Sequence, residues 1–256
     1  MNIGIIGIGH MGQAMIKGLK NFYNAKDIYA MNPVNPRISR FQKQIGFNLY
    51  HHYSDLEAKP LDVLILTTPA AITIHILEQL KDLNPNTIIL SAAAGIKIVT
   101  IKQILPNNPI VTMIPNIPVA VNRGTIGVAL NGLKLSQQKT VTKFLQTLGE
   151  VVPVSENQLS IVGTVGGCGP AFVDVFMEAM SDVAVENGLS RKLAHQAIAS
   201  MVEGSGALMK HSAKSPADLK DEVTSPGGTT IKGVIALESG SFRKALMDAV
   251  NKANHN

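Results

Sequence analysis

The first 154 residues alternate short apolar runs with longer stretches in which apolar residues recur at helical spacing. The runs predict β-strands and the periodic stretches predict helices, as in repeated βαβ units. Such units build a mostly parallel sheet of Rossmann type, which places the fold in the α/β class. The predicted strands are Ile3–Ile8, Ile28–Met31, Asp62–Thr67, Thr87–Ser91, Ile110–Ile114, Ile126–Leu130 and Val151–Val154, and the predicted helices are 11–21, 35–45, 70–82, 98–105 and 135–148.

Beyond residue 155 the strand patterns stop, and helical periodicity covers 157–187, 191–211, 229–239 and 241–254. These stretches are rich in Ala, Met, Gly and Leu, which suits either an ordinary core or a helix–helix dimer surface. We favour the dimer surface, because a helical domain this small would otherwise leave apolar helix faces exposed to water. The sequence therefore predicts two domains, a dinucleotide-binding domain over 1–154 and an all-α dimerisation domain over 155–256.

A glycine motif, Gly7-x-Gly9-x-x-Gly12, lies between the first predicted strand and the first predicted helix. Gly7 suits the tight turn, Gly9 lets a pyrophosphate approach, and Gly12 lets the helix pack close to the strand. A glycine-rich turn that binds no nucleotide is the alternative. The position of the motif favours dinucleotide binding, with a cleft lined by the turns Gly7–Gly12, Asn32–Pro33, Thr67–Pro69, Ala92–Gly95 and Pro115–Pro118.

The end of the second predicted strand indicates which dinucleotide binds. In an NAD-binding protein an acidic residue at this position would hydrogen-bond the ribose hydroxyls. This chain has Asn32 there, and Arg37 and Arg40 follow. Asn32 does not repel a 2′-phosphate, and the arginines are able to pair with it. NADPH is therefore favoured, with NADH as the alternative; the arginines also fit as solvated charges on the next helix.

A second motif runs from Val223 to Thr230, where proline, two glycines and hydroxyl residues come before an apolar-periodic segment. This order predicts a tight turn followed by a helix start, whose unpaired N–H groups and dipole attract an anion. Thr230 adds a hydroxyl group, so a small carboxylate suits the site. From these residues alone, a capped helix start without a ligand stays open.

Composition excludes several classes of protein. The net charge is +5, but the basic residues are scattered and do not alternate with aromatics, so we expect small anionic substrates and no nucleic acid. No apolar stretch reaches the length of a membrane span, the nearest being Val63 to Ile76. We expect no signal peptide, because the apolar N-terminus lacks a basic n-region and is predicted as the first strand. One cysteine, Cys168, fits a reducing cytoplasm. No metal site is expected, and His51 and His52 are predicted as surface histidines on a strand.

Five blocks in order resemble the pyrroline-5-carboxylate reductase family over nearly the full length of the chain. They are Ile6-Gly7-Ile8-Gly9-His10-Met11-Gly12, Ser91-Ala92-Ala93-Ala94-Gly95-Ile96, Met113-Ile114-Pro115-Asn116-Ile117-Pro118, Gly167-Cys168-Gly169-Pro170-Ala171-Phe172 and Asp221 to Thr230. The resemblance implies hydride transfer from NAD(P)H to the imine carbon of 1-pyrroline-5-carboxylate, which gives proline. It also implies a homodimer and allows a decamer of dimers.

The resemblance also implies site residues. The substrate carboxylate is expected at Ser225, Gly227, Gly228, Thr229 and Thr230, with the Thr230 hydroxyl as the catalytic group that assists protonation of the ring nitrogen. The cofactor is expected at Gly7, Gly9, His10, Met11, Gly12, Asn32, Thr67, Thr68, Pro69, Ala92, Ala93, Ala94 and Asn116.

The chain departs from the family pattern at a few positions. Thr68 stands where the family usually has lysine, Cys168 and Gly166 stand where it commonly has serine, and Ile117 replaces a threonine. We interpret Cys168 as a packing residue. A β-hydroxyisobutyrate-type dehydrogenase is disfavoured because residues 171–180 contain no lysine. A paralogue that senses NADP without turnover, and a related cyclic imine as substrate, stay open.

Overall fold

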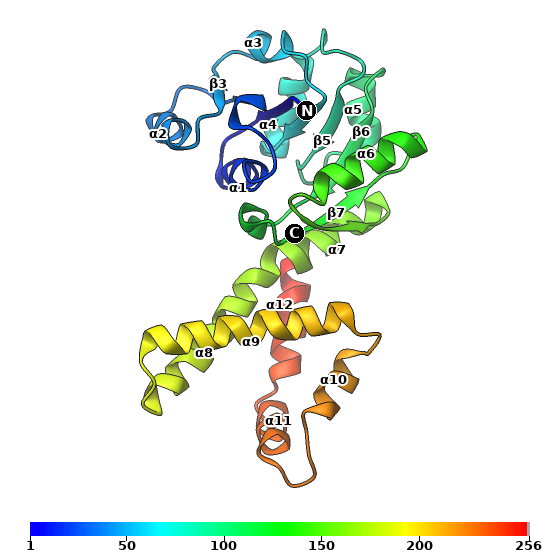
Figure 1. Ribbon diagram of the computed structural model, residues 1–256. Coiled ribbons are helices and arrows are strands. Elements are labelled where there is room, and N and C mark those ends of the chain that lie inside the picture. Colours follow the sequence, from blue (N-terminus) through cyan, green and yellow to red (C-terminus); the bar gives the residue numbers. More distant parts are fainter. Residues whose placement is uncertain (255–256) are drawn as a thin grey trace. The chain divides into compact units, whose positions relative to one another are not determined.

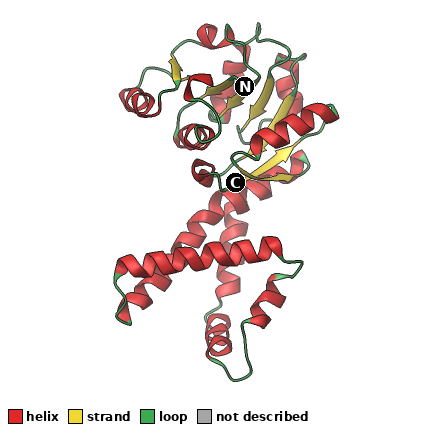
Figure 2. Cartoon of the chain, viewed as in Figure 1, coloured by secondary structure: helices red, strands yellow, loops and turns green. Residues whose placement is uncertain are grey.

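The computed structural model describes residues 1–254 and divides the chain into two compact units, Met1–Gly167 and Cys168–Asn256. All strands of the described residues lie in the first unit, and the second contains helices and loops alone (Figure 2). The first unit continues past the predicted boundary at residue 154 because helix α7 (Leu159–Gly163) packs on the sheet. Val162 lies against Gly127 of strand β7, and Gly163 lies against Ile114 of β6.

The first unit is built around one eight-stranded sheet in the order β3-β2-β1-β4-β5-β6-β7-β8. The first six strands are mutually parallel, β7 is antiparallel to β6, and β8 is parallel to β7. This confirms the mostly parallel sheet. The strands are β1 (Ile3–Ile6), β2 (Ile28–Met31), β3 (Asn48–Tyr50), β4 (Val63–Leu66), β5 (Ile88–Ser91), β6 (Ile110–Ile114), β7 (Gly124–Ala129) and β8 (Gly149–Pro153).

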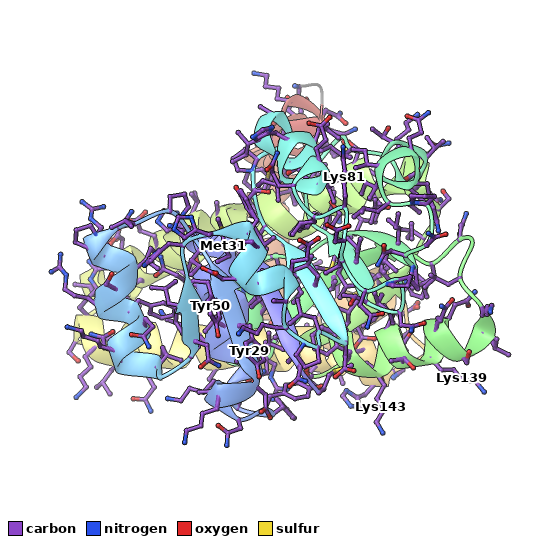
Figure 3. All side chains as sticks on the ribbon, turned by 90° about the horizontal axis from the view of Figure 1, so that it is seen from above. Tyr29, Met31, Tyr50, Lys81, Lys139 and Lys143 are labelled. Atoms are coloured by element: carbon purple, nitrogen blue, oxygen red, sulfur yellow. The ribbon has the colours of Figure 1, made fainter. Side chains whose placement is uncertain are left out.

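Strand β3 was not among the predicted strands, and it changes the place of the histidine pair. The strand has three half-buried residues and no run of large aliphatic side chains. His51 and His52 were expected on a strand, but they follow β3 in a bend. The stacked rings of Tyr29 and Tyr50, whose centroids are 6.5 Å apart, join β2 to β3 (Figure 3).

The alternation of side chains along the strands separates two apolar layers. Ile5 belongs to one cluster and its neighbour Ile6 to the other. Helices α1 (His10–Leu19), α2 (Pro36–Ile45) and α6 (Leu135–Leu145) cover the first layer, and α3 (Tyr53–Glu57), α4 (Ala70–Glu78) and α5 (Ile98–Ile104) cover the second (Figure 1). Since both faces of the sheet are buried, ligands have access to this unit at the strand ends.

A continuous helical run, Glu156–Glu186, leads into the second unit. It comprises a 3₁₀ turn (Glu156–Gln158), α7, a π-helical turn (Thr164–Cys168) and α8 (Gly169–Glu186). The π turn contains Gly166 and Gly167. Helices α9 (Arg191–His211), α10 (Pro216–Glu222), α11 (Thr229–Ser239) and α12 (Phe242–Asn254) follow.

The helices of the second unit expose much apolar surface in the single chain. Val175, Val183 and Met247 are each more than half exposed. Among residues 1–254, the run Glu156–Glu186 is also long and apolar enough to cross a membrane by length and composition, a feature the sequence analysis missed. Only 11% of its apolar window is buried. An apolar surface of this kind marks a contact with a partner or a membrane.

Candidate functional site

The glycine motif forms the turn between β1 and α1. Gly7 has a φ of +92°, a conformation that strains other residues, and its N–H donates to Met31 O at 3.0 Å. A Cβ at Gly7 would lie 2.6 Å from the Thr68 methyl group. The turn is therefore fixed between β2 and the end of β4.

Gly9 and Gly12 meet different surroundings. A Cβ at Gly12 would overlap the carbonyl oxygen of Gly7, whereas a Cβ at Gly9 would meet nothing within 4 Å. Gly12 therefore allows α1 to pack on the turn, and Gly9 leaves open space at the helix start. Gln13 N–H donates to Gly9 O, so the N–H groups of residues 10–12 precede the first intrahelical bond and face outward for an anion.

Asn32, at the end of β2, holds the glycine turn in place. Its Oδ1 accepts from Ile8 N–H at 2.9 Å, and its Nδ2 donates to Pro33 O at 2.8 Å. Its backbone carbonyl lies 2.8 Å from His51 Nδ1, and its N–H donates to Tyr50 O. The structure thus brings His51, which sequence reasoning placed on the surface, to the predicted ribose end of the cleft.

The residues after β4 are turned toward the protein. Thr67 Oγ1 donates to Gly7 O at 2.5 Å, which joins this segment to the glycine turn. Thr68 is only 8% exposed, and its hydroxyl lies 2.8 Å from that of the buried Thr73. Pro69 is exposed at the start of α4. Thr68 is therefore a buried packing residue. Its side chain does not extend into solvent as the side chain of a lysine at this position would.

Small side chains follow β5. Ala92 N–H donates to Leu66 O at 2.8 Å, Ala93 is buried and Ala94 is exposed. The next helix, α5, is held at its first residue by Glu156, whose Oε1 accepts from Ile98 N–H at 2.6 Å. The segment thus combines small side chains with a backbone that is held by its neighbours.

Asn116, after β6, is 6% exposed, and both the nitrogen and the oxygen of its side-chain amide are hydrogen-bonded to backbone groups of the protein. Its Nδ2 donates to Gly166 O in the π turn at 2.8 Å, and its Oδ1 accepts from Thr125 N–H at 2.8 Å. Asn116 therefore fixes the π turn beside the end of β6. Because β1, β2, β4, β5 and β6 are parallel, all the predicted cofactor residues lie at the same edge of the sheet.

The predicted substrate residues lie in the second unit, between α10 and α11. Gly228 N–H donates to Ser225 O at 3.0 Å, with Pro226 and Gly227 between them. Gly227 has a φ of +71°, so these four residues form a type II turn, the type that favours proline followed by glycine. The sequence thus predicts this turn through its own chemistry.

Helix α11 begins directly after this turn. Its N-cap is Gly228, which has no side chain to bond the first N–H groups of the helix. Thr229 and Thr230 are exposed, and no hydrogen bond of either hydroxyl occurs among the described residues. The carboxylate of Glu222 pairs with Lys214. The turn thus offers backbone donors, a helix dipole and free hydroxyls to a carboxylate.

Charge is divided unevenly between the two units. Residues 1–167 contain fourteen lysines and arginines against eight acids, whereas residues 168–256 contain nine against ten. The dinucleotide edge therefore lies in a positively charged unit, which favours an anionic ligand.

The chain is similar to known proteins over its full length. The family model of pyrroline-5-carboxylate reductase dimerisation matches residues 156–256, and that of NADP oxidoreductase, coenzyme F420-dependent, matches residues 2–95. Pyrroline-5-carboxylate reductase of Treponema pallidum is 31% identical over 99% of this chain and 98% of its own length. That of Escherichia coli is 32% identical over 98% and 94%. The crystal structure of Plasmodium falciparum pyrroline carboxylate reductase with NADP bound superposes with a TM-score of 0.84 at 27% identity, covering 99% and 95% of the two chains.

Proposed function

Because the chain belongs to the pyrroline-5-carboxylate reductase family, it reduces 1-pyrroline-5-carboxylate to proline with NAD(P)H, and we propose which of its residues do so. When bound, NADPH supplies a hydride to the imine carbon. The electron pair of the C=N bond moves to the ring nitrogen, which takes a proton. The observation that best supports the residue assignment is the pair of open helix starts, one at α1 and one at α11.

The helix start at α1 receives the cofactor diphosphate. The N–H groups of His10 and Met11 bind phosphate oxygens, and the open space at Gly9 lets them approach. Gly7 and Gly12 shape the turn, and Asn32 and Thr67 hold it from the neighbouring strands. Pro69 and Ala92–Ala94 line the cofactor cleft. Thr68 and Asn116 stabilise the backbone around the cleft through their hydrogen bonds to Thr73 and Gly166.

Gly9→Ala is expected to raise the KM for NADPH at least about tenfold, because a methyl group would occupy the space left for the diphosphate. The melting temperature should stay unchanged, since no protein atom outside residues 8–10 lies within 4 Å of the added carbon. Steady-state kinetics with a thermal melt measures both, and the KM for 1-pyrroline-5-carboxylate is the internal control. A variant that binds NADPH like the native protein would exclude this placement of the diphosphate.

Salt is expected to weaken cofactor binding. The excess of basic residues in residues 1–167 attracts the polyanionic cofactor, and added ions screen that attraction. Raising NaCl from about 50 to 300 mM should increase the KM for NADPH about threefold. Sucrose of equal osmolality is the control, and an equal rise in sucrose would show that charge is not the cause.

The helix start at α11 binds the substrate carboxylate. The N–H groups of Thr229 and Thr230 are the donors. The Gly228 N–H, which was expected to join them, already donates to Ser225 O, so Gly228 acts with Ser225 and Gly227 in setting the turn that presents them. The Thr230 hydroxyl contacts the ring nitrogen and assists its protonation. No nucleophile or metal is needed, because the reaction consists of a hydride and a proton delivered to one C=N bond.

The helical unit carries the family's dimerisation region, and the chain oligomerises through it. We assign its exposed apolar face, including that of α8, to the homodimer, with a decamer of dimers as the larger assembly. The cytoplasm is the proposed location, supported by the single cysteine. Light scattering coupled to size-exclusion chromatography tests the assembly, and a monomer would contradict it.

The reductase assignment is tested by adding 1-pyrroline-5-carboxylate and following NADPH and NADH absorbance in parallel, with proline measured by mass spectrometry. Oxidation of the cofactor with equimolar proline is expected, faster with NADPH. Tight NADPH binding without oxidation would instead indicate the sensing paralogue. Oxidation with another cyclic imine alone would indicate a different substrate.

A further inference from the structure

His51 is held at the end of β2 by a bond that fixes the orientation of its ring. The ring nitrogen Nδ1 lies 2.8 Å from the carbonyl oxygen of Asn32, 19 residues away in the chain. A carbonyl oxygen only accepts, so Nδ1 carries the proton of this bond. The other ring nitrogen, Nε2, is left for a different partner. His51 is half-buried, whereas the adjacent His52 is exposed.

The strand order around His51 identifies that partner. In sheets ordered 3-2-1-4-5-6, the adenosine ribose of a dinucleotide lies at the end of the second strand, and the 2′-phosphate of NADP adds to that ribose. Asn32 occupies this strand end, but its side chain already bonds to Ile8 N–H and Pro33 O. His51 is bonded to the same residue with one nitrogen free.

The charges of the surrounding segment suit a phosphate. Residues 28–54 contain no Asp or Glu and include Arg37, Arg40 and Lys43 in addition to the two histidines. Arg40 Nε is bonded to Pro36 O, while Arg37 is exposed at the first turn of α2. A phosphate monoester carries three strong acceptor oxygens. An Nε2–H group of His51 is able to donate a hydrogen bond to one of them.

We propose that His51 binds the 2′-phosphate of NADPH through Nε2 and is a specificity-determining residue for NADPH over NADH. This inference rests on the proposed reductase function for its kinetic readout. Asn32 then acts as the positioning residue, because its carbonyl sets the His51 ring and its side chain sets the glycine turn.

Two substitutions separate the nitrogen atoms of the ring. His51→Asn keeps a donor near the position of Nδ1 and removes the group at Nε2, whereas His51→Gln keeps a donor near Nε2. His52→Gln, at the exposed neighbour, is the matched control. The measured quantities are kcat/KM for NADPH and for NADH, and the dissociation constants of NADP⁺ and NAD⁺ by calorimetry.

His51→Asn is expected to lower kcat/KM for NADPH about tenfold and to leave that for NADH unchanged, with a smaller loss in His51→Gln. His52→Gln should change neither. Equal losses with both cofactors, or a larger loss of NADPH selectivity in His51→Gln than in His51→Asn, would overturn the proposal and leave His51 a structural residue. If the native protein does not reduce 1-pyrroline-5-carboxylate, the reductase function fails alone. The ratio of NADP⁺ to NAD⁺ dissociation constants then still decides the role of His51.

Discussion

Thr230→Ala is expected to lower kcat/KM for 1-pyrroline-5-carboxylate about 100-fold, because proton transfer by a positioned side chain typically contributes a factor of this size or more. The hydroxyl is exposed and has no hydrogen bond within the described residues, so its removal breaks no internal contact. Alanine also favours helices more than threonine does. The melting temperature and the KM for NADPH should therefore stay as in the native protein.

The matched variants of this experiment lie in the same helix turn. Thr230→Ser keeps the hydroxyl and should recover most of the activity. Thr229→Ala removes the neighbouring hydroxyl but keeps the backbone N–H, so its loss should stay below about tenfold. A Thr230→Ala enzyme as fast as the native one would show that solvent protonates the nitrogen. An enzyme that loses affinity for the substrate but not kcat would restrict Thr230 to binding.

The conformational preferences of single residues were enough to predict the strand and the turn on which the two sites are built. Ile5 and Ile6 face two different apolar layers because successive side chains of a strand point to opposite faces, and the apolar run Ile3–Ile8 predicted this strand. Pro226 and Gly227 form a type II turn because their backbone preferences require it. In such places a residue's own conformational preference decides the structure, so one sequence is sufficient.

The sequence did not predict which groups the side chains of the site are hydrogen-bonded to. Asn32 and Asn116 were expected at the cofactor, yet each amide bonds to the protein on both sides. The partner of Asn116 is 50 residues away in the chain, and the partner of His51 is 19 away. A sequence shows which groups are able to bond, but the fold decides which of them meet.

The helical unit shows the same limit on a larger scale. Its periodicity predicted helices, but not that so few of their side chains would be buried in the single chain. Residues that a partner covers carry the same apolar pattern as residues of a core, because burial by either route removes them from water. The helical periodicity by itself therefore left both faces open. It was the small size of the domain that favoured the dimer surface, and the match to the dimerisation family supports that prediction.

Gly12→Ala should destabilise the first unit by about 3 kcal/mol, at the upper end of what overpacking costs. The added methyl group would overlap the carbonyl oxygen of Gly7, and backbone cannot yield as a flexible side chain does. Gly7 itself is fixed by its positive φ and its bond to Met31 O. Helix α1 must then move outward, although it buries Met15, Ile16 and Leu19 against the sheet.

A thermal melt measures this effect, and a fall of about 6 to 12 °C corresponds to that loss in a protein of this size. Cofactor binding should be lost as well, because the N–H groups at the start of α1 would be displaced from the position that binds the diphosphate. Gly9→Ala is the control that separates the loss of stability from the loss of cofactor binding, since it adds the same methyl group where no protein atom outside residues 8–10 lies within 4 Å. A Gly12→Ala variant as stable as Gly9→Ala would show that α1 adjusts to the extra carbon. Close packing of helix on turn would then not be the reason for this glycine.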